Sequence, residues 1–141
     1  MKTLSLWQPW ATLIAIEAKR YETRSWSTKH RGLLAIHAAK KWDGLLKEYC
    51  DTEPFYSSLH GDKEAIVLPL GYIVAVVKLV DVHKVEKVRA QLSKNELAFG
   101  NYADGRYAWE LQLVKKFEKP IPMNGAQGLF EVADDLILRF M

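Results

Sequence analysis

The sequence lacks the marks of disulfide-stabilised, zinc-binding and membrane-spanning proteins. Cys50 is the only cysteine among 141 residues, so no internal disulfide can form, and no cysteine–histidine cluster has the spacing of a zinc site. The longest uncharged apolar run, residues 72–77, is far shorter than the roughly 18 residues that a membrane helix needs. We therefore expect a cytoplasmic protein, in a reducing compartment, with no membrane association and with no metal or cofactor implied.

Linkers and low-complexity segments are absent as well. Hydrophobic residues make up 49% of the chain and charged residues 26%, which is the composition of an ordinary globular domain. No stretch rich in glycine, serine and proline divides the chain, and no segment repeats. Residues 1–141 are therefore predicted to form one domain.

Positive charge is concentrated in the first third of the chain. The net charge is only +3, yet residues 1–41 hold eight lysines and arginines against two glutamates, a net charge of +6. Residues 42–141 consequently carry −3. This asymmetry suggests a nucleic acid or another polyanion as partner, although a solvated basic face would have the same composition.

Hydrophobic patterns predict several short strands and a few small helices. Strands or extended segments are expected at residues 4–6, 21–26, 33–39, 72–82, 107–114 and 129–133. Helices are expected at residues 10–18, from Asp43 as N-cap to about residue 49, and at 85–92, whereas residues 54–61 are expected to be irregular. The pattern fits an α+β fold, a compact mixed β-barrel with flanking short helices, better than a doubly wound parallel sheet.

Three motifs between residues 4 and 41 contain most of the chemistry. They are Gln8-Pro9-Trp10-Ala11, the segment Glu17–Arg24, and His30-Arg31-Gly32 followed by an apolar run and Lys40. Together they resemble the ASCH family, named for homology to activating signal cointegrator, whose pattern is a Gln-Pro-Trp-Ala helix start and a Gly-x-Lys-x-x-Glu-x-Arg segment. Residues 105–109 and 125–130 are similar to bacterial members, so the resemblance covers the whole chain.

The resemblance implies a PUA-like β-barrel with flanking helices and a role with RNA or another nucleic acid. The family's glycine is replaced by Glu17, which implies that a backbone turn is made differently here.

The residues from Lys19 to Arg24 can also be interpreted without the family. If the backbone is extended, Tyr21 and Thr23 share one face, and Arg20, Glu22 and Arg24 share the other. The neighbouring cations would hold Glu22 ionised, and the surplus cations would remain free for an anionic ligand. Tryptophans interleaved with this charge suit base stacking. The predicted nucleic-acid-binding residues are Trp7, Lys19, Arg20, Tyr21, Arg24, Trp26, Lys29, Arg31 and Lys40.

Two other functions stay open. The resemblance includes small amidohydrolases that act on acetylated cytidine, and others linked to RNA cleavage. These amidohydrolases place a lysine three residues before a threonine. Lys19 matches that lysine, but Glu22 stands where they have the threonine, so Glu22 would act as a general base or as a ligand anchor, and Lys19 would help to activate water. Glu86 and Glu96 are candidate third acids. A protein-interaction adaptor is the last possibility. His37 lies in an apolar strand and is expected to be a core histidine.

Overall fold

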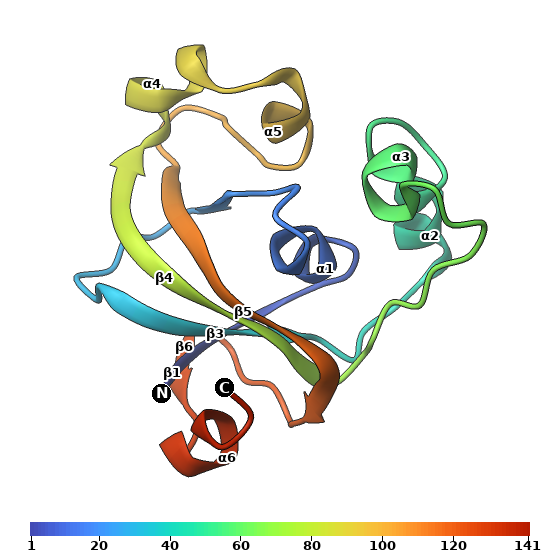
Figure 1. The fold of residues 1–141 in the computed structure, drawn as a ribbon. Coiled ribbons are helices and arrows are strands. Elements are labelled where there is room, and N and C mark those ends of the chain that lie inside the picture. Colours follow the sequence, from blue (N-terminus) through green and yellow to red (C-terminus); the bar gives the residue numbers. More distant parts are fainter.

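Six strands form one strongly curled sheet in the computed structural model, which describes all 141 residues (Figure 1). The strands are β1 (Lys2–Leu6), β2 (Tyr21–Arg24), β3 (Gly32–Ala38), β4 (Tyr72–Lys84), β5 (Tyr107–Pro122) and β6 (Leu129–Glu131). Their order is β2-β5-β4-β3-β1-β6, with β1 parallel to β3 and all other neighbours antiparallel. The predicted α+β fold with a mixed, barrel-like sheet is confirmed.

Short helices surround the sheet. They are α1 (Trp10–Ala15), α2 (Gly44–Cys50), α3 (Phe55–His60), α4 (Val85–Val88), α5 (Lys94–Ala98) and α6 (Asp134–Leu138), with a 3₁₀ turn at Arg89–Gln91. α1 lies on the concave side of the sheet, α4 and α5 lie at one end of the molecule, and α6 lies at the other end near both termini (Figure 1). None of these helices has the length and apolar character required to cross a bilayer.

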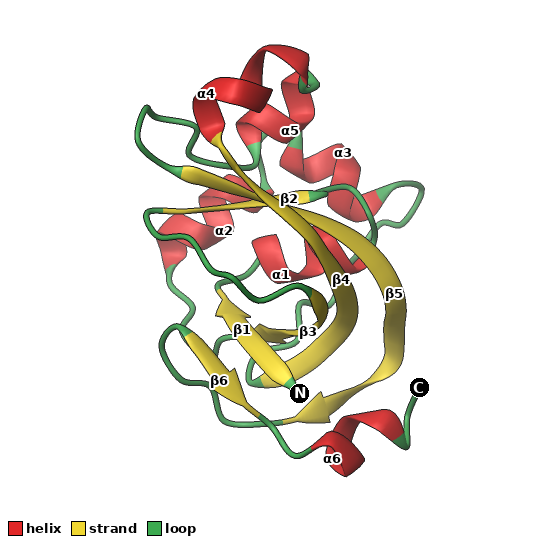
Figure 2. Ribbon diagram, turned by 90° about the vertical axis from the view of Figure 1, so that its left-hand side faces the viewer, coloured by secondary structure: helices red, strands yellow, loops and turns green.

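The curvature of the sheet comes mainly from the two long strands β4 and β5, which curve side by side along their length (Figure 2). Their pairing shifts register at three places, between Ile73 and Ala75, between Val76 and Val77, and between Leu79 and Asp81. Such bulges bend a strand and increase its twist, which lets two long strands wrap around a core. β5 extends to Pro122, beyond the predicted end at residue 114. Proline is tolerated in this part of the strand because the edge of β5 that faces away from β4 pairs with β2 only as far as Glu110.

Alternating side chains of the strands build two cores. The larger one surrounds the fully buried Trp109 and includes Leu34 of β3, Val77 of β4 and Ile14 of α1. The smaller one uses the opposite face and packs Ile137 of α6 against the sheet. This arrangement confirms the period-two pattern predicted for residues 107–114.

α2 begins at its predicted N-cap, whereas α3 forms where no helix was predicted. Asp43 caps α2 as predicted, since its Oδ1 accepts a hydrogen bond from the backbone N–H of Leu46 at 3.1 Å. The prediction of an irregular segment at residues 54–61 is wrong, because α3 forms there. Phe55 and Leu59, one helical turn apart, are buried against Phe99, and this distant contact stabilises a helix too short to show its own periodicity.

α1 ends at Ala15, three residues before its predicted end, because the backbone reverses at Glu17. Glu17 has φ 62°, the left-handed conformation that glycine adopts without steric cost. Glu17 thus stands where the ASCH pattern has glycine, takes the left-handed conformation that glycine favours, and bears the strain of doing so with a side chain.

We expect the variant Glu17→Gly to raise the free energy of unfolding by about 1 kcal/mol, because glycine relieves this strain. Glu17→Ala is the matched control. It also removes the exposed carboxylate but keeps the Cβ atom, so it should bring no gain. Urea unfolding of the three proteins makes the comparison, and a glycine variant no more stable than the alanine variant would contradict the assignment of strain.

Candidate functional site

A cleft of about 420 Å³ opens where the end of β1, the start of α1, β2 and the turn after α5 meet. It is lined by aromatic side chains and by charged or polar ones. The residues that define it are Trp7, Trp10, Glu22, Arg24, Trp26, Asn101 and Arg106. Because these segments are far apart in the sequence, only the folded sheet brings the aromatic and basic groups together.

Glu22 is the central charge of this site. Its Oε1 lies 3.5 Å from Nζ of Lys19, and its Oε2 lies 3.1 Å from Nε of Arg24. The Glu22 side chain is 11% exposed, whereas that of Lys19 is fully buried and donates a hydrogen bond to the carbonyl oxygen of Phe99 at 2.9 Å. Lys19 therefore lies behind the cleft, and Glu22 and Arg24 line it.

Arg24 and Arg106 supply the positive charge inside the cleft. Nη2 of Arg24 donates to the carbonyl oxygen of Ser5 at 3.1 Å. Arg106 donates from Nε to the Asn101 carbonyl at 3.0 Å and from Nη2 to the Thr23 carbonyl at 3.2 Å. In both guanidinium groups Nη1 makes no hydrogen bond or ion pair within the chain, so each keeps a donor for a ligand.

Arg106 and Asn101 are not among the residues predicted from the sequence. Both lie about 80 residues beyond β2, and no local pattern connects them to it. The signal that could have found Arg106 is its place in the stretch 105–109, which already resembled the ASCH family.

The tryptophans of the cleft differ in how far they are exposed. Trp7 is 45% exposed, and Nζ of Lys41 lies 4.4 Å from the centre of its ring. Trp26 is half-buried and packs edge-to-face on Trp109 at 4.9 Å. Trp10 packs into the neighbouring core as well as lining the cleft. Trp7 and Trp26 are therefore the rings that a ligand can reach.

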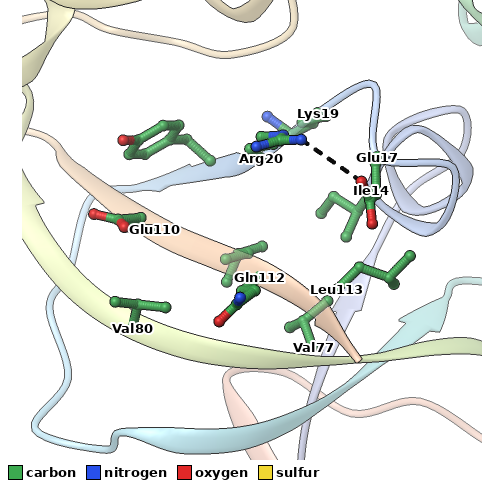
Figure 3. Close-up of a pocket in the computed structure, with 11 residues that line it drawn as sticks. Ile14, Glu17, Lys19, Arg20, Val77, Val80, Glu110, Gln112 and Leu113 are labelled. Atoms are coloured by element: carbon green, nitrogen blue, oxygen red, sulfur yellow. Dashed lines mark ion pairs between the residues drawn. The ribbon is translucent and has the colours of Figure 1, made fainter. Parts of the chain in front are cut away.

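Arg20 and Tyr21 line a different pocket, of about 470 Å³, which Lys19 also lines and which residues of β4 and β5 border (Figure 3). The Arg20 side chain is 68% exposed and lies 3.6 Å from the carboxylate of Glu17. Glu110 and Gln112 of β5 face the same space. Arg20 precedes β2, so the strand alternation that places Glu22 and Arg24 together does not extend to it.

The remaining predicted cations lie away from the cleft. Arg31 is exposed and pairs with Asp81 of β4 at 3.3 Å. Lys40 donates to Oδ1 of Asn124 at 3.0 Å, near the opposite end of β3. Lys29 is exposed in the loop before β3. The structure thus brings together Trp7, Glu22, Arg24 and Trp26 with Lys19 behind them, and it separates Arg20, Tyr21, Lys29, Arg31 and Lys40 from that group.

Of the two candidate third acids, Glu96 lies close to the Lys19 side of the site. Its Oε1 accepts a hydrogen bond from the backbone N–H of Arg20 at 2.7 Å, while its Oε2 is buried without a partner. Burial raises the pKa of Glu96, and the hydroxyl of Tyr102, likewise buried without a partner, has a pKa raised by the same cause. Glu86 instead accepts a hydrogen bond from the N–H of Gly105 at an exposed position. No group of three or more histidine, cysteine and acidic side chains is placed to hold a metal ion.

The curled mixed sheet, flanked by short helices and carrying a cleft beside β1 and β2, defines a small PUA-like β-barrel domain. The sequence model of the ASCH domain matches residues 4–121, so the chain belongs to the ASCH family.

Curated relatives and solved structures agree with this assignment. Activating signal cointegrator 1 of Homo sapiens and that of Mus musculus are each 38% identical over 80 residues, which is 55% of this chain and 14% of theirs. The match therefore spans about one seventh of the length of these relatives. The crystal structure of an ASCH protein from Zymomonas mobilis gives a TM-score of 0.52 at 15% identity, covering 98% of this chain and 91% of that one. A tyrosine-to-phenylalanine variant of it gives 0.53 at 14%, covering 98% and 94%. At such identities the likeness shows the fold.

The raised pKa of Glu96 makes stability depend on pH in a definite direction. The folded protein binds this proton more strongly than the unfolded chain, so the contribution of Glu96 to stability is present below its ordinary pKa of 4.5 and is lost as the pH rises through the folded value. The variant Glu96→Gln keeps an acceptor for the Arg20 N–H but cannot carry a negative charge. We expect its free energy of unfolding, relative to that of wild type, to be higher at about pH 8 than at about pH 4. Urea unfolding of both proteins at both pH values gives this double difference. A difference of zero or of opposite sign would contradict the burial of a charged Glu96.

Proposed function

We propose that this domain binds single-stranded nucleic acid, RNA in the first place, in the cleft between β1, β2 and the turn after α5. The observation that carries the proposal is the exposed ring of Trp7 facing the same cavity as Arg24 and Arg106. Aromatic rings stack on bases of any sequence, and guanidinium groups donate to phosphate oxygens in a planar fork. The cleft therefore offers a place for a base beside a place for a phosphate.

The charge balance of the cleft supports an anionic ligand. Arg24 and Arg106 line the cleft with Glu22 as its one carboxylate, and Glu22 is already paired with Lys19 from behind. Lys41 adds a positive charge over the ring of Trp7. Glu22 fixes Lys19 and Arg24 in place, so the arginine is already oriented when the ligand arrives. A preoriented arginine loses less side-chain entropy on binding. The basic groups outside the cleft, Arg20, Lys29, Arg31 and Lys40, would contact only more distant phosphates of a longer chain.

Hydrolysis of a modified nucleoside or of RNA is the alternative function, and the buried Lys19–Glu22 pair favours it. The Glu22 carboxylate lines the cleft and would be the general base, with Lys19 as its ion-pair partner at 3.5 Å. A protein partner, the third option of the sequence analysis, has no particular surface to support it beyond the family's relation to a signal cointegrator.

Removing either cleft arginine should weaken binding of a fluorescein-labelled RNA of about ten nucleotides. We expect Arg24→Gln and Arg106→Gln each to lower the affinity roughly tenfold, since a hydrogen bond to a charged group contributes about 1.5–3 kcal/mol. Each variant should also reduce the slope of log Kd against log salt by about 0.7, the value for one phosphate contact on a single strand. Fluorescence anisotropy over a salt series measures both quantities.

Arg139→Gln is the matched control for this experiment, because it removes one exposed arginine from the far end of the molecule. It should leave the affinity nearly unchanged. Equal losses in all three variants would mean that binding depends on net charge alone and not on the cleft. A salt-independent affinity of the wild-type protein would exclude nucleic acid as the ligand.

Trp7 gives a separate test of base stacking. We expect Trp7→Ala to lower the affinity for the same RNA by about tenfold, since stacking of one base contributes about 1–3 kcal/mol. Trp42→Ala removes a tryptophan that is 37% exposed and does not line the cleft, so it should have little effect. Anisotropy with RNA, with DNA of the same sequence and with an RNA duplex shows the preference of the site. Similar losses from both tryptophan variants would argue against a base platform at Trp7.

A further inference from the structure

A pocket of about 470 Å³, the Lys40 pocket, lies where β3 ends, β4 begins and β5 ends. Lys40, Tyr72, Met123 and Asn124 are among the residues that line it. No acidic side chain lines it, so the only charge at its wall is positive. The pocket is distinct from the cleft, with which it shares no lining residue.

Lys40 is held along the wall of this pocket. Its Nζ donates a hydrogen bond to Oδ1 of Asn124 at 3.0 Å. Its side chain passes over Gly71, where a Cβ atom would lie 2.9 Å from Cγ of Lys40, so a residue without a side chain lets the lysine lie close to the backbone. Asn124 is neutral and Lys40 forms no ion pair, so its charge is not neutralised within the chain. Two of its three N–H donors remain for a ligand.

The buried side chain of His37 fixes the segment that carries Met123 and Asn124. Nε2 of His37 lies 2.7 Å from the carbonyl oxygen of Met123, which can only accept, so Nε2 carries a hydrogen and donates it. Nδ1 then accepts from the hydroxyl of Ser5 at 2.8 Å. Burial lowers the pKa of His37, so the ring is neutral at neutral pH. His37 is therefore a core histidine, as expected, and it holds this wall of the pocket in place without a ligand.

Residues 39–41 connect the Lys40 pocket to the cleft. The backbone N–H of Ala39 donates to the carbonyl oxygen of Leu6 at 2.8 Å, and Leu6 lines the cleft. Nζ of Lys41 lies 4.4 Å from the centre of the Trp7 ring, which also lines the cleft, whereas Lys40 lines its own pocket. Two consecutive lysines therefore present positive charge to two neighbouring cavities.

We propose that the Lys40 pocket binds the nucleotide next to the one held in the cleft, and that the phosphate joining the two nucleotides lies over Lys40 and Lys41. The inference rests on the proposed function, because the first nucleotide is the one stacked at Trp7. The ring of Tyr72 is 36% exposed and offers a second surface for a base, and the side-chain N–H groups of Asn124 have no partner within the chain. The smallest ligand that fills both cavities is therefore a dinucleotide and not a single nucleoside.

Uridine monophosphate and the dinucleotide pUpU test the proposal as unlabelled competitors of the fluorescein-labelled RNA. We expect wild type to bind the dinucleotide at least about tenfold more tightly, because its second nucleotide binds as an intramolecular step. Lys40→Gln and Tyr72→Ala should each remove most of this preference, since a charged hydrogen bond and a stacked base each contribute about tenfold. Both variants should leave the affinity for the monophosphate unchanged, whereas Trp7→Ala should weaken both competitors equally.

Lys87→Gln and Tyr56→Ala are the matched controls. Lys87 is exposed on α4, beyond the other end of β4 from Tyr72, and Tyr56 is 44% exposed on α3. Both variants should keep the wild-type preference for the dinucleotide. Circular dichroism and thermal unfolding confirm that each variant is folded.

The inference is overturned if wild type binds the monophosphate and the dinucleotide equally, or if Lys40→Gln and Tyr72→Ala both keep the full preference. The proposed function stands in that case as long as RNA binding still depends on Arg24 and Trp7. The opposite result, in which Lys40→Gln and Tyr72→Ala lose the preference while Arg24→Gln and Trp7→Ala bind as wild type, removes the cleft as the nucleotide site and leaves the Lys40 pocket with its ligand.

Discussion

The ion pairs of Glu22 hold the cleft in its shape. One carboxylate bridges Lys19 and Arg24, and each of these cations continues the connection to another segment. Lys19 binds the carbonyl of Phe99 at the end of α5, and Arg24 binds the carbonyl of Ser5 on β1. Three chain segments are thus fastened through a single side chain. Because Lys19 and Glu22 are buried, loss of one partner would leave an uncompensated charge, which costs about 3–5 kcal/mol in comparable buried pairs.

Hydrogen bonds to residues in and just before β2 hold the turn after α5 in place at its beginning and at its end. Glu96 of α5 accepts the backbone N–H of Arg20, and Asn101 donates its N–H to Oγ1 of Thr23 at 3.0 Å. Arg106 closes the same region by binding two carbonyl groups. The backbone of Arg20 and both the backbone and the side chain of Thr23 therefore find their partners on a segment about 75 residues later, and the cleft exists only when both segments are folded together. The buried polar groups of this region fix a unique arrangement of a turn that contains little regular structure.

Local patterns predicted the parts of the molecule whose structure is locally determined. The strands, the N-cap at Asp43, and the shared face of Glu22 and Arg24 follow from periods of two residues and from capping chemistry. The site was predicted less completely, because sequence proximity was used in place of spatial proximity. Arg31 and Lys40 flank the same strand, but its seven residues, at a rise of about 3.3 Å each, put roughly 20 Å between its two ends. Arg106 was missed for the opposite reason, since its neighbours in space are distant in sequence.

Ser5 makes different contacts with its backbone and with its side chain, because successive side chains of β1 point to opposite faces of the sheet. Leu4 and Leu6 turn into the main core and anchor β1, which leaves the groups of Ser5 between them free for polar contacts. The carbonyl of Ser5 accepts from Arg24, and its hydroxyl donates to His37. The backbone of this residue therefore belongs to the ion-pair network of Glu22, while its side chain belongs to the histidine on β3. A ligand that contacts Arg24 is consequently held against the backbone of a strand that is fixed on both faces, by Leu4 and Leu6 in the core and by the hydrogen bond of Ser5 to His37.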